Sequence, residues 1–232
     1  MDAIILAGGK GTRLRSLVSD RPKPMAEVCG KPFLFYILNE IIKNKIDKII
    51  ISVGYKKDSI INYFGDSFKG VPIVYSIEDS PLLTGGAIKK ALCCVDGSDF
   101  FVLNGDSFTS IPFIDLINLK KQKSTSLVIA ANFVSNSNRY GLIDFNKQCR
   151  IISFREKSPV SIEGYINSGI YLMDKNIFLN YGNSVFSFEN DFLPSYVKSN
   201  PSFVHLSHDF FIDIGVPSDY LLAQRIFRER SH

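Results

Sequence analysis

The sequence predicts a protein of the α/β class with a largely parallel central sheet. Strand and helix patterns alternate through the first half of the chain, which is typical of right-handed βαβ units. The second half shows mostly short strands and is richer in β structure. With 232 residues, 45% of them hydrophobic, the chain can bury one sizeable core, so we expect a single domain.

The first half begins with a buried strand and continues in strand–helix pairs. Ala3 to Leu6 is a short apolar run, which indicates a buried strand. Pro32 stands at a helix start, and the apolar residues after it recur at helical spacing. The expected elements are a strand at 3–6, a helix at 33–42, a strand at 48–53, a helix at 59–64, a strand at 72–77, a helix at 84–94 and a strand at 100–103.

From about residue 126 onward, short strands are followed by two helices. The expected strands are 127–132, 142–145, 151–154 and 165–172. The expected helices are 188–197, which Pro194 interrupts, and 218–230.

A glycine-rich loop, Gly8-Gly9-Lys10-Gly11, follows the first strand. Three glycines in four positions let backbone N–H groups turn toward one point, which forms a nest for an anion. Arg13 and Lys23 place two cations near the same loop. This combination favours a polyphosphate ligand over a purely structural turn.

Two better-known phosphate motifs do not fit this loop. The Walker pattern needs G-x-x-x-x-G-K-[ST], and that string does not occur in the chain. The dinucleotide fingerprint needs a third glycine where this chain has Leu14. The loop is therefore expected to bind a triphosphate in another way.

Two aspartates near the ends of apolar strands are candidate metal ligands. Asp106 follows the strand at 100–103, and Asp213 lies in the short apolar run 211–216. Either residue alone would be typical of a turn. Because Mg²⁺ bridges one or two carboxylates to substrate phosphates, the two aspartates and the loop together predict metal-assisted phosphoryl or nucleotidyl transfer.

The loop and the segment after it resemble the signature of the sugar-1-phosphate nucleotidylyltransferases. The string G-G-x-G-T-R-L at 8–14 is followed by P-K-P-M at 22–25, and this two-part motif is highly specific. The resemblance covers essentially the whole chain and is greatest with members that join GTP to D-glycero-α-D-manno-heptose 1-phosphate. It implies a Rossmann-like nucleotidyltransferase fold, with three α/β/α layers and a mixed, mostly parallel central sheet.

The resemblance also implies roles for the first half of the chain. Arg13 would lie at the departing pyrophosphate, Lys23 at the α-phosphate, and Asp106 and Asp213 would hold Mg²⁺. The chain would form one domain, 1–232, with a nucleotide-binding half at 1–125 and a sugar-phosphate-binding half at 126–229. We interpret residues 230–232 as tag-derived. The expected nucleotide-binding residues are Leu6, Ala7, Gly8, Gly9, Gly11, Thr12, Glu78, Thr84, Gly85, Gly86, Asn104 and Asp106.

In the second half, a Y-G pair, an E-K pair and an N-S-G triplet match strings that meet the sugar phosphate in this family. The family's E-K-P string has its proline directly after the lysine, whereas here Ser158 intervenes, so the loop conformation can differ. The expected sugar-phosphate-binding residues are Tyr140, Gly141, Glu156, Lys157, Asn167 and Gly169.

Residues 78–87 match the family's base-binding segment. The Gly85-Gly86 pair at a helix start allows close backbone approach to a planar ring, and Leu83 stands where the family usually has glycine, which alters the pocket wall. An ionised Glu78 only accepts hydrogen bonds. It therefore suits the adjacent N1–H and N2–H donors of guanine slightly better than the single N–H of uracil or thymine, which favours GTP.

Two other functions remain open. The same motifs serve guanylyl-, uridylyl- and thymidylyltransferases that act on hexose or amino-sugar 1-phosphates of the mannose, glucose or N-acetylmuramate type. A catalytically silent nucleotide-sugar-binding regulatory subunit is a different class. Such a subunit would be expected to lose the lysine or the metal aspartates, and Lys23, Asp106 and Asp213 are all present.

Composition limits the other classes of protein. The net charge is +4, and the basic residues are scattered, so a nucleic-acid partner is not expected. Four cysteines without C-x-x-C spacing and three histidines predict reduced, mostly buried thiols and no zinc site. Neither a signal peptide nor a membrane-length apolar run is present, so we expect a cytoplasmic monomer or small homo-oligomer without a membrane partner.

Overall fold

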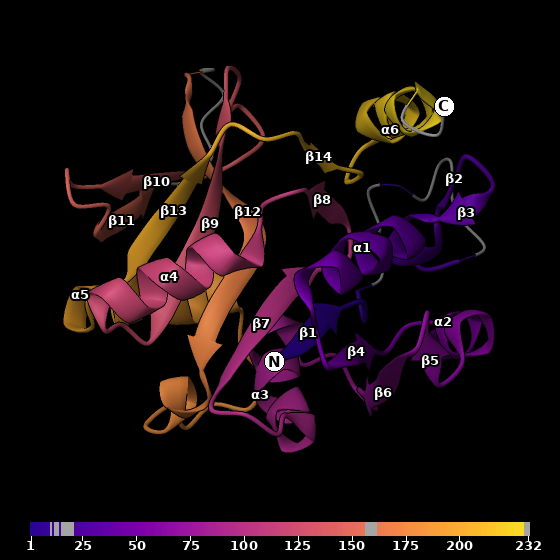
Figure 1. Ribbon diagram of the computed structural model, residues 1–232, viewed down its shortest axis with the longest axis horizontal. Coiled ribbons are helices and arrows are strands. Elements are labelled where there is room, and N and C mark those ends of the chain that lie inside the picture. Colours follow the sequence, from indigo (N-terminus) through magenta and orange to yellow (C-terminus); the bar gives the residue numbers. More distant parts are fainter. Residues whose placement is uncertain (10, 12–13, 15–20, 156–161, 230–232) are drawn as a thin grey trace.

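A computed structural model describes residues 1–9, 11, 14, 21–155 and 162–229. A ten-stranded mixed sheet forms its centre (Figure 1). The strands are β1 (Asp2–Leu6), β4 (Lys48–Val53), β5 (Ser67–Phe68), β6 (Val71–Ile77), β7 (Asp99–Asn104), β9 (Leu127–Val134), β10 (Leu142–Phe145), β11 (Ile151–Arg155), β12 (Gly164–Asp174) and β13 (Phe203–Ser207). Their order is β11–β10–β12–β7–β1–β4–β6–β5, with β9 pairing β12 and β13.

The first half supplies the parallel part of this sheet. Strand β1 runs parallel to β4 and to β7, and β4 runs parallel to β6. Leu6 lies beside Ser52 of β4 and Asn104 of β7, so the carboxyl ends of these strands meet at one edge. Strand β12 then joins β7 and β9 in antiparallel fashion, which confirms the expected mixed sheet.

Helices cover both faces of the sheet. They are α1 (Phe33–Ile41), α2 (Lys57–Phe64), α3 (Leu83–Ala91), α4 (Phe113–Lys123), α5 (Leu193–Ser199) and α6 (Pro217–Glu229), with the short turns η2 (Lys23–Met25), η3 (Ile42–Asn44), η4 (Leu92–Cys94), η5 (Lys175–Phe178) and η6 (Phe188–Phe192). None of the helices in the described residues is long and apolar enough to cross a bilayer.

Two buried clusters separate the layers. Successive residues of a strand point to opposite faces, so Ala3 and Ile5 of β1 pack with α1, α2, α4 and α6. Ile4 packs on the other face with α3, α5, η5 and η6. The three-layer arrangement follows from this alternation.

Several elements differ from the sequence-based expectation. Helix α4 was not predicted; it buries only Phe113 and Leu116, so its apolar stripe is too narrow to signal a helix. The helix expected at 188–197 is a π-helical turn, η6, followed by α5, with Pro194 in the first turn of α5, where a missing N–H is tolerated.

The cysteines also differ from the expectation of mostly buried thiols. Cys93 is exposed, and Cys29, Cys94 and Cys149 are half-buried. Cys93 and Cys94 lie in the surface turn η4 after α3, and Cys149 lies in a turn with positive φ. No group of three or more potential metal-ligating His, Cys, Asp or Glu side chains occurs within the described ranges.

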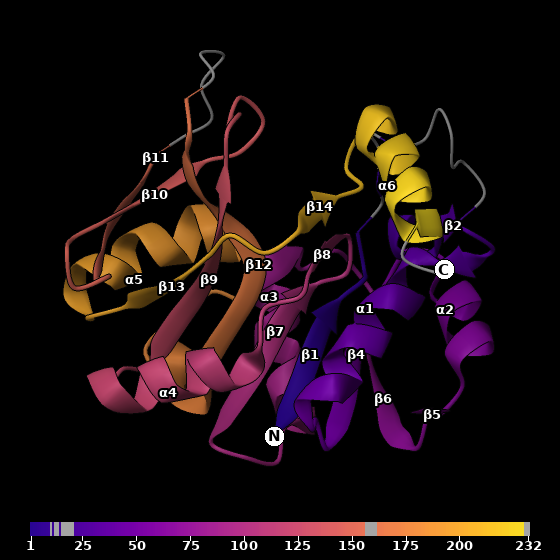
Figure 2. The same cartoon turned by 45° about the horizontal axis from the view of Figure 1, so that its top comes forward.

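Two small strand pairs and the last helix close the fold around one edge of the sheet. Strand β14 (Phe211–Asp213) pairs with β8 (Ser107–Thr109), and β2 (Glu27–Val28) pairs with β3 (Lys31–Pro32). Figure 2 shows β14 leading into α6, which lies beside β2. Tyr220 and Gln224 of α6 both donate hydrogen bonds to the carbonyl of Glu27, each at 2.5 Å.

Helix α6 is anchored by an aromatic cluster beneath it. The Phe227 ring lies 4.3 Å from Tyr36, 5.1 Å from Phe108 and 6.1 Å from Phe33, measured between centroids. Docking of α6 fixes the chain that leads into it, including Asp213 and Gly215, against Lys23.

We expect Phe227→Ala to lower the free energy of unfolding by about 3–5 kcal/mol, because it removes a buried ring from this cluster. The matched control is Leu221→Ala on the same helix, where the side chain is 60% exposed and the change should stay within about 0.5 kcal/mol. Urea denaturation followed by circular dichroism measures both. Equal effects of the two substitutions would contradict the docking described here.

Candidate active site

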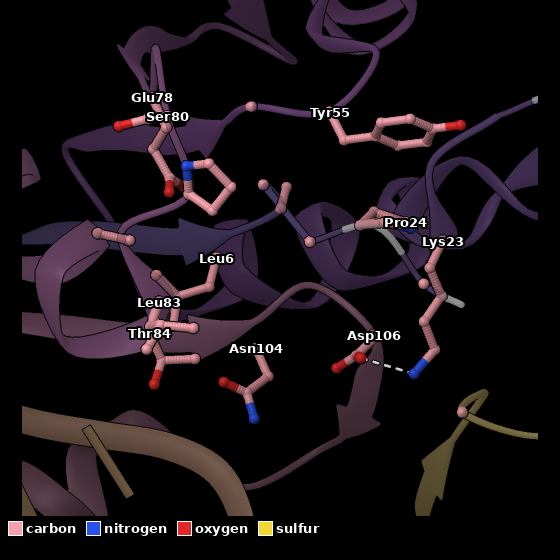
Figure 3. Close-up of a pocket in the computed structure, with 18 of the residues that line it drawn as sticks. Leu6, Lys23, Pro24, Tyr55, Glu78, Ser80, Leu83, Thr84, Asn104 and Asp106 are labelled. Atoms are coloured by element: carbon pink, nitrogen blue, oxygen red, sulfur yellow. Dashed lines mark hydrogen bonds and ion pairs between the residues drawn. The ribbon is translucent and has the colours of Figure 1, made fainter. Parts of the chain in front are cut away.

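A cavity of about 830 Å³ opens beyond the carboxyl ends of β1, β4, β6 and β7 (Figure 3). This is where ligands bind in open α/β sheets. Most of the predicted nucleotide-binding residues lie in its wall, namely Leu6, Ala7, Gly8, Gly9, Gly11, Glu78, Thr84, Asn104 and Asp106. Thr12 and Arg13 lie outside the described residues.

Two positions in the loop after β1 require glycine, because neighbouring side chains approach the backbone closely there. A Cβ on Gly8 would lie 2.3 Å from Oε1 of Glu78. Gly11 has a φ of +58°, and a Cβ there would lie 2.8 Å from Cβ of Lys23. The loop therefore passes against the two charged side chains that mark the ends of the cavity, and glycine lets it do so.

Glu78 is held in place before any ligand arrives. The buried Ser52 hydroxyl donates to its Oε1 at 3.0 Å, and the backbone N–H of Leu82 donates to its Oε2 at 3.2 Å. An ionised carboxylate has about four lone-pair sites, so two hydrogen bonds leave acceptor capacity for a ligand in the cavity. Glu78 is thus a preorganised acceptor at one end of the site.

At the other end, Lys23 lies between two carboxylates. Its Nζ is 2.6 Å from Oδ2 of Asp106 and 3.2 Å from Oδ1 of Asp213, and its side chain is only 9% exposed. The pairing of β14 with β8 places Asp213 beside Ser107, next to Asp106 in the chain. A buried ammonium needs such counter-charges, and the pairing of two short strands provides both of them.

The same aspartates suit a divalent cation. Burial, and then the charge of Asp106, raise the pKa of Asp213 despite the opposing effect of Lys23. Two carboxylates face one ammonium here, so the lysine compensates only part of the negative charge that the pair carries when both are ionised. Asp106 lies in the wall of a cavity large enough for a nucleotide, and Asp213 contacts the same lysine beside it. Two such carboxylates are the donors that Mg²⁺ uses together with phosphate oxygens.

The Gly85-Gly86 pair lies outside the cavity wall and packs against the segment before η6. A Cβ on Gly85 would lie 2.1 Å from the Phe186 ring, and one on Gly86 would lie 2.3 Å from the Ser184 carbonyl. Both glycine N–H groups donate to the Phe186 carbonyl, at 2.9 and 3.2 Å. Their close packing is therefore with protein, and contact with a nucleobase stays a prediction.

Glu189 connects the predicted nucleotide-binding half to the predicted sugar-phosphate-binding half, and no local pattern indicated this residue. Its Oε2 accepts a hydrogen bond from the Thr84 hydroxyl at 2.5 Å, and its Oε1 accepts one from the Tyr171 hydroxyl at 3.1 Å. The Tyr171 hydroxyl in turn accepts a hydrogen bond from Asn167 at 2.7 Å. One carboxylate thus joins the cavity wall at Thr84 to the predicted sugar-binding residue Asn167.

The predicted sugar-side residues on β12 adjoin the cavity. Gly169 has a φ of +75°, and a Cβ there would lie 2.5 Å from Nδ2 of Asn104, which lines the cavity. The Gly169 N–H donates to Oδ1 of Asn167 at 2.9 Å. The irregularity of β12 between Asn167 and Tyr171 therefore brings this stretch against the end of β7.

Tyr140 approaches from the loop before β10. Burial, and then the negative charge of Asp213, raise its pKa to about 12, so its hydroxyl is protonated at neutral pH. Arg139 donates to that hydroxyl at 2.9 Å and pairs with Asp219 of α6 at 2.6 Å. Gly141 packs against the Arg155 carbonyl. Glu156 and Lys157 lie outside the described residues.

The cavity wall also contains residues that the sequence analysis did not assign to the site. Gly54 and Tyr55 follow β4 in the same way that Glu78 follows β6, so the expected strand at 48–53 carried a signal for them. Gly215 is a further addition. The wall also contains Pro24 of the P-K-P-M motif and five more residues of the predicted base-binding segment 78–87, namely Asp79, Ser80, Pro81, Leu83 and Ala87. His205 lies in β13 and His208 lies just after it.

We expect Glu189→Ala to cost about 1–3 kcal/mol of folding free energy, because the fully buried Tyr171 loses its hydrogen-bond acceptor. Glu163→Ala is the matched control, since Glu163 is exposed and should have little effect. In Tyr171→Phe, which lacks the hydroxyl, Glu189→Ala should cost less, and a double-mutant cycle measures the difference. Strictly additive effects of the two substitutions would show that the hydrogen bond between Glu189 and Tyr171 contributes no free energy of folding.

Comparison with known proteins agrees with this geometry. The protein-family model described as "Nucleotidyl transferase" matches residues 2–230. The chain is 42% identical over 226 residues to a D-glycero-alpha-D-manno-heptose 1-phosphate guanylyltransferase of Aneurinibacillus thermoaerophilus, covering 97% of each chain. It is 45% identical over 221 residues to the enzyme of the same name from Campylobacter jejuni, covering 95% of this chain and 97% of that one.

A solved structure matches over almost the whole fold. The crystal structure of HddC from Yersinia pseudotuberculosis, complexed with GMP-PN, superposes with a TM-score of 0.88 at 37% identity and covers 97% of this chain and 99% of that chain. The family match spans nearly all of the described structure, including both aspartates and Lys23. The chain therefore belongs to the nucleotidyl transferase family.

Proposed function

We propose that this protein joins GTP and D-glycero-α-D-manno-heptose 1-phosphate to give GDP-heptose and pyrophosphate. The observation that carries the proposal is Lys23 held between Asp106 and Asp213 in the wall of a cavity that also contains the glycine loop and Glu78. Relatives at 42% and 45% identity are heptose 1-phosphate guanylyltransferases, and the solved relative at 37% identity binds GMP-PN, which carries guanine.

The nucleotide would lie along the cavity between its two charged ends. Glu78 accepts hydrogen bonds from the base, and the backbone of Gly8, Gly9 and Gly11 faces the triphosphate. Arg13 and Thr12, which the resemblance assigns to the same phosphates, would act from the same loop. This orientation puts the α-phosphate near Lys23, where a positive charge is already buried.

The reaction is a direct displacement at phosphorus. An oxygen of the sugar phosphate forms a bond to the α-phosphorus of GTP while the bond from that phosphorus to the pyrophosphate oxygen breaks. The attacking oxygen is already anionic, so the protein needs no general base. Its contribution is to align the two phosphates and to place Lys23, and Arg13 with it, beside the charge that develops.

Asp106 and Asp213 are the residues that would hold Mg²⁺. When bound, the ion would neutralise phosphate charge and help to orient the triphosphate. Asp213 reaches this position through β14 and Asp106 through the turn before β8. The two side chains also keep Lys23 extended toward the cavity, so they position the lysine whether or not a metal is present.

The sugar phosphate would bind between β12 and the loop before β10. Asn167 and Gly169 lie against Asn104, and the protonated Tyr140 hydroxyl lies near Asp213. Gly141, Glu156 and Lys157 would complete this side, with Lys157 on the phosphate. We also propose that the reaction takes place in the cytoplasm and that the product serves as an activated heptose donor for a surface polysaccharide.

The substrate pair is tested by measuring pyrophosphate release for GTP, UTP, dTTP, ATP and CTP against a set of sugar 1-phosphates. The set contains the manno-configured heptose, mannose, glucose, N-acetylglucosamine and N-acetylmuramate compounds. We expect activity with GTP and the heptose phosphate. Preference for UTP or dTTP would identify a different nucleotidylyltransferase, and binding without turnover for every pair would identify a regulatory subunit.

Lys23→Ala is expected to lower kcat by about 10²- to 10³-fold, the usual cost of removing one preorganised charge donor, while the Kd for GTP changes far less. Lys48→Ala is the matched control. Lys48 also lies between two aspartates, Asp2 and Asp96, but at the amino ends of the strands, so kcat should not change. Near-normal turnover of Lys23→Ala would refute the assigned role.

A further inference from the structure

Leu83 begins helix α3 in a backbone conformation that L-residues with a branched side chain rarely adopt. Its φ is +61°, in the left-handed region where Cβ meets the following carbonyl. The other described non-glycine residues with positive φ are Cys29, Lys45, Lys56, Lys69, Ser124 and Cys149. Among these described residues, Leu83 alone carries a branched apolar side chain.

The neighbours of Leu83 enforce this conformation. The N–H of Leu82 is held by Glu78 at 3.2 Å, and the carbonyl of Leu82 accepts from Phe186 at 3.2 Å. On the other side, the Gly85 N–H donates to the Phe186 carbonyl at 2.9 Å. The chain is anchored on both sides of Leu83, so the residue between must turn, and a glycine would make this turn without strain.

Core packing does not account for a leucine here. The Leu83 side chain is 54% exposed and belongs to neither buried cluster of the described structure. A branched apolar side chain that is both strained and exposed is unfavourable in the unligated protein. Strain of this kind is typically retained at ligand sites, where the surrounding structure holds it in place.

Leu83 lies in the wall of the cavity, at the end that contains Glu78. Figure 3 shows it beside Thr84 and close to Leu6, on the side of the cavity away from Lys23 and Asp106. Ala87 also lines the cavity, one helical turn after Leu83. This end therefore combines an acceptor carboxylate with apolar side chains, which suits a planar heterocycle with N–H donors on its edge.

We propose that Leu83 is a specificity-determining residue of the base pocket, whose isobutyl group packs on the face of the base and favours purines over pyrimidines. The inference rests on the proposed function. The free energy gained by covering apolar surface scales with the area covered. A purine has two fused rings where a pyrimidine has one, so it covers more of the leucine side chain. Leu83 adds this size preference to the donor preference that Glu78 imposes on the ring edge.

The test compares Leu83→Gly and Leu83→Ala with the wild type by calorimetric titration of GTP and UTP, without sugar phosphate, and by thermal unfolding of the free protein. Both variants should bind GTP about 5- to 10-fold more weakly, while the Kd for UTP changes less than about 2-fold. Leu83→Gly relieves the backbone strain, so its Tm should rise by about 2–4 °C. Leu83→Ala keeps the strain, so its Tm should stay close to that of the wild type.

Ser124→Gly is the matched control. Ser124 caps the end of α4 with a φ of 47° and is exposed, so this variant should gain a similar Tm and bind GTP as the wild type does. Unchanged GTP affinity in both Leu83 variants, equal losses for GTP and UTP, or a lower Tm for Leu83→Gly would overturn the inference alone. Failure of the wild type to bind any nucleoside triphosphate would overturn the proposed function as well.

Discussion

The ion cluster of Lys23, Asp106 and Asp213 is the interaction on which the rest of the site depends. It joins segments separated by 83 and 190 residues along the chain. A lysine this deeply buried requires its counter-charges, so the cluster holds only if β14 pairs with β8 and α6 docks on β2. The packing of the last helix, far from the phosphate loop in sequence, thereby determines where the central cation lies.

A second cluster of the same composition shows why position matters. Lys48 bridges Asp2 and Asp96 at the opposite edge of the sheet, with Nζ–Oδ2 distances of 3.4 and 2.5 Å. There the hydrogen bond from Lys48 lowers the pKa of the exposed Asp96, whereas burial raises the pKa of Asp213. In the Lys48 cluster one of the two aspartates, Asp96, is 86% exposed, whereas Asp106 and Asp213 are 38% and 22% exposed. The clusters therefore differ in the solvation of the second carboxylate and in their position, because only the Lys23 cluster adjoins the cavity.

The two proposed substrate sites share structural elements. Gly169 of β12 lies against Asn104 of the cavity wall, and Glu189 binds both Thr84 and Tyr171. The segment around Phe186 holds the start of α3, including both glycines and the strained turn at Leu83. Parts of the second half therefore shape the proposed base pocket of the first half, although the two halves have different strand patterns.

The sequence by itself determined the parallel strands of the first half, the glycine loop, Lys23, Glu78 and the two aspartates. These signals are local, because apolar periodicity and polar residues at strand ends can be recognised within a few positions. Only the tertiary structure decided that Asp213 meets Asp106 through β14 and β8, that Glu189 joins Thr84 to Tyr171, and that Gly85 and Gly86 pack against Phe186. Each of these depends on strand pairing or on contacts between segments far apart in the chain. Local patterns do not specify such contacts, because many alternative pairings satisfy the same residue periodicity.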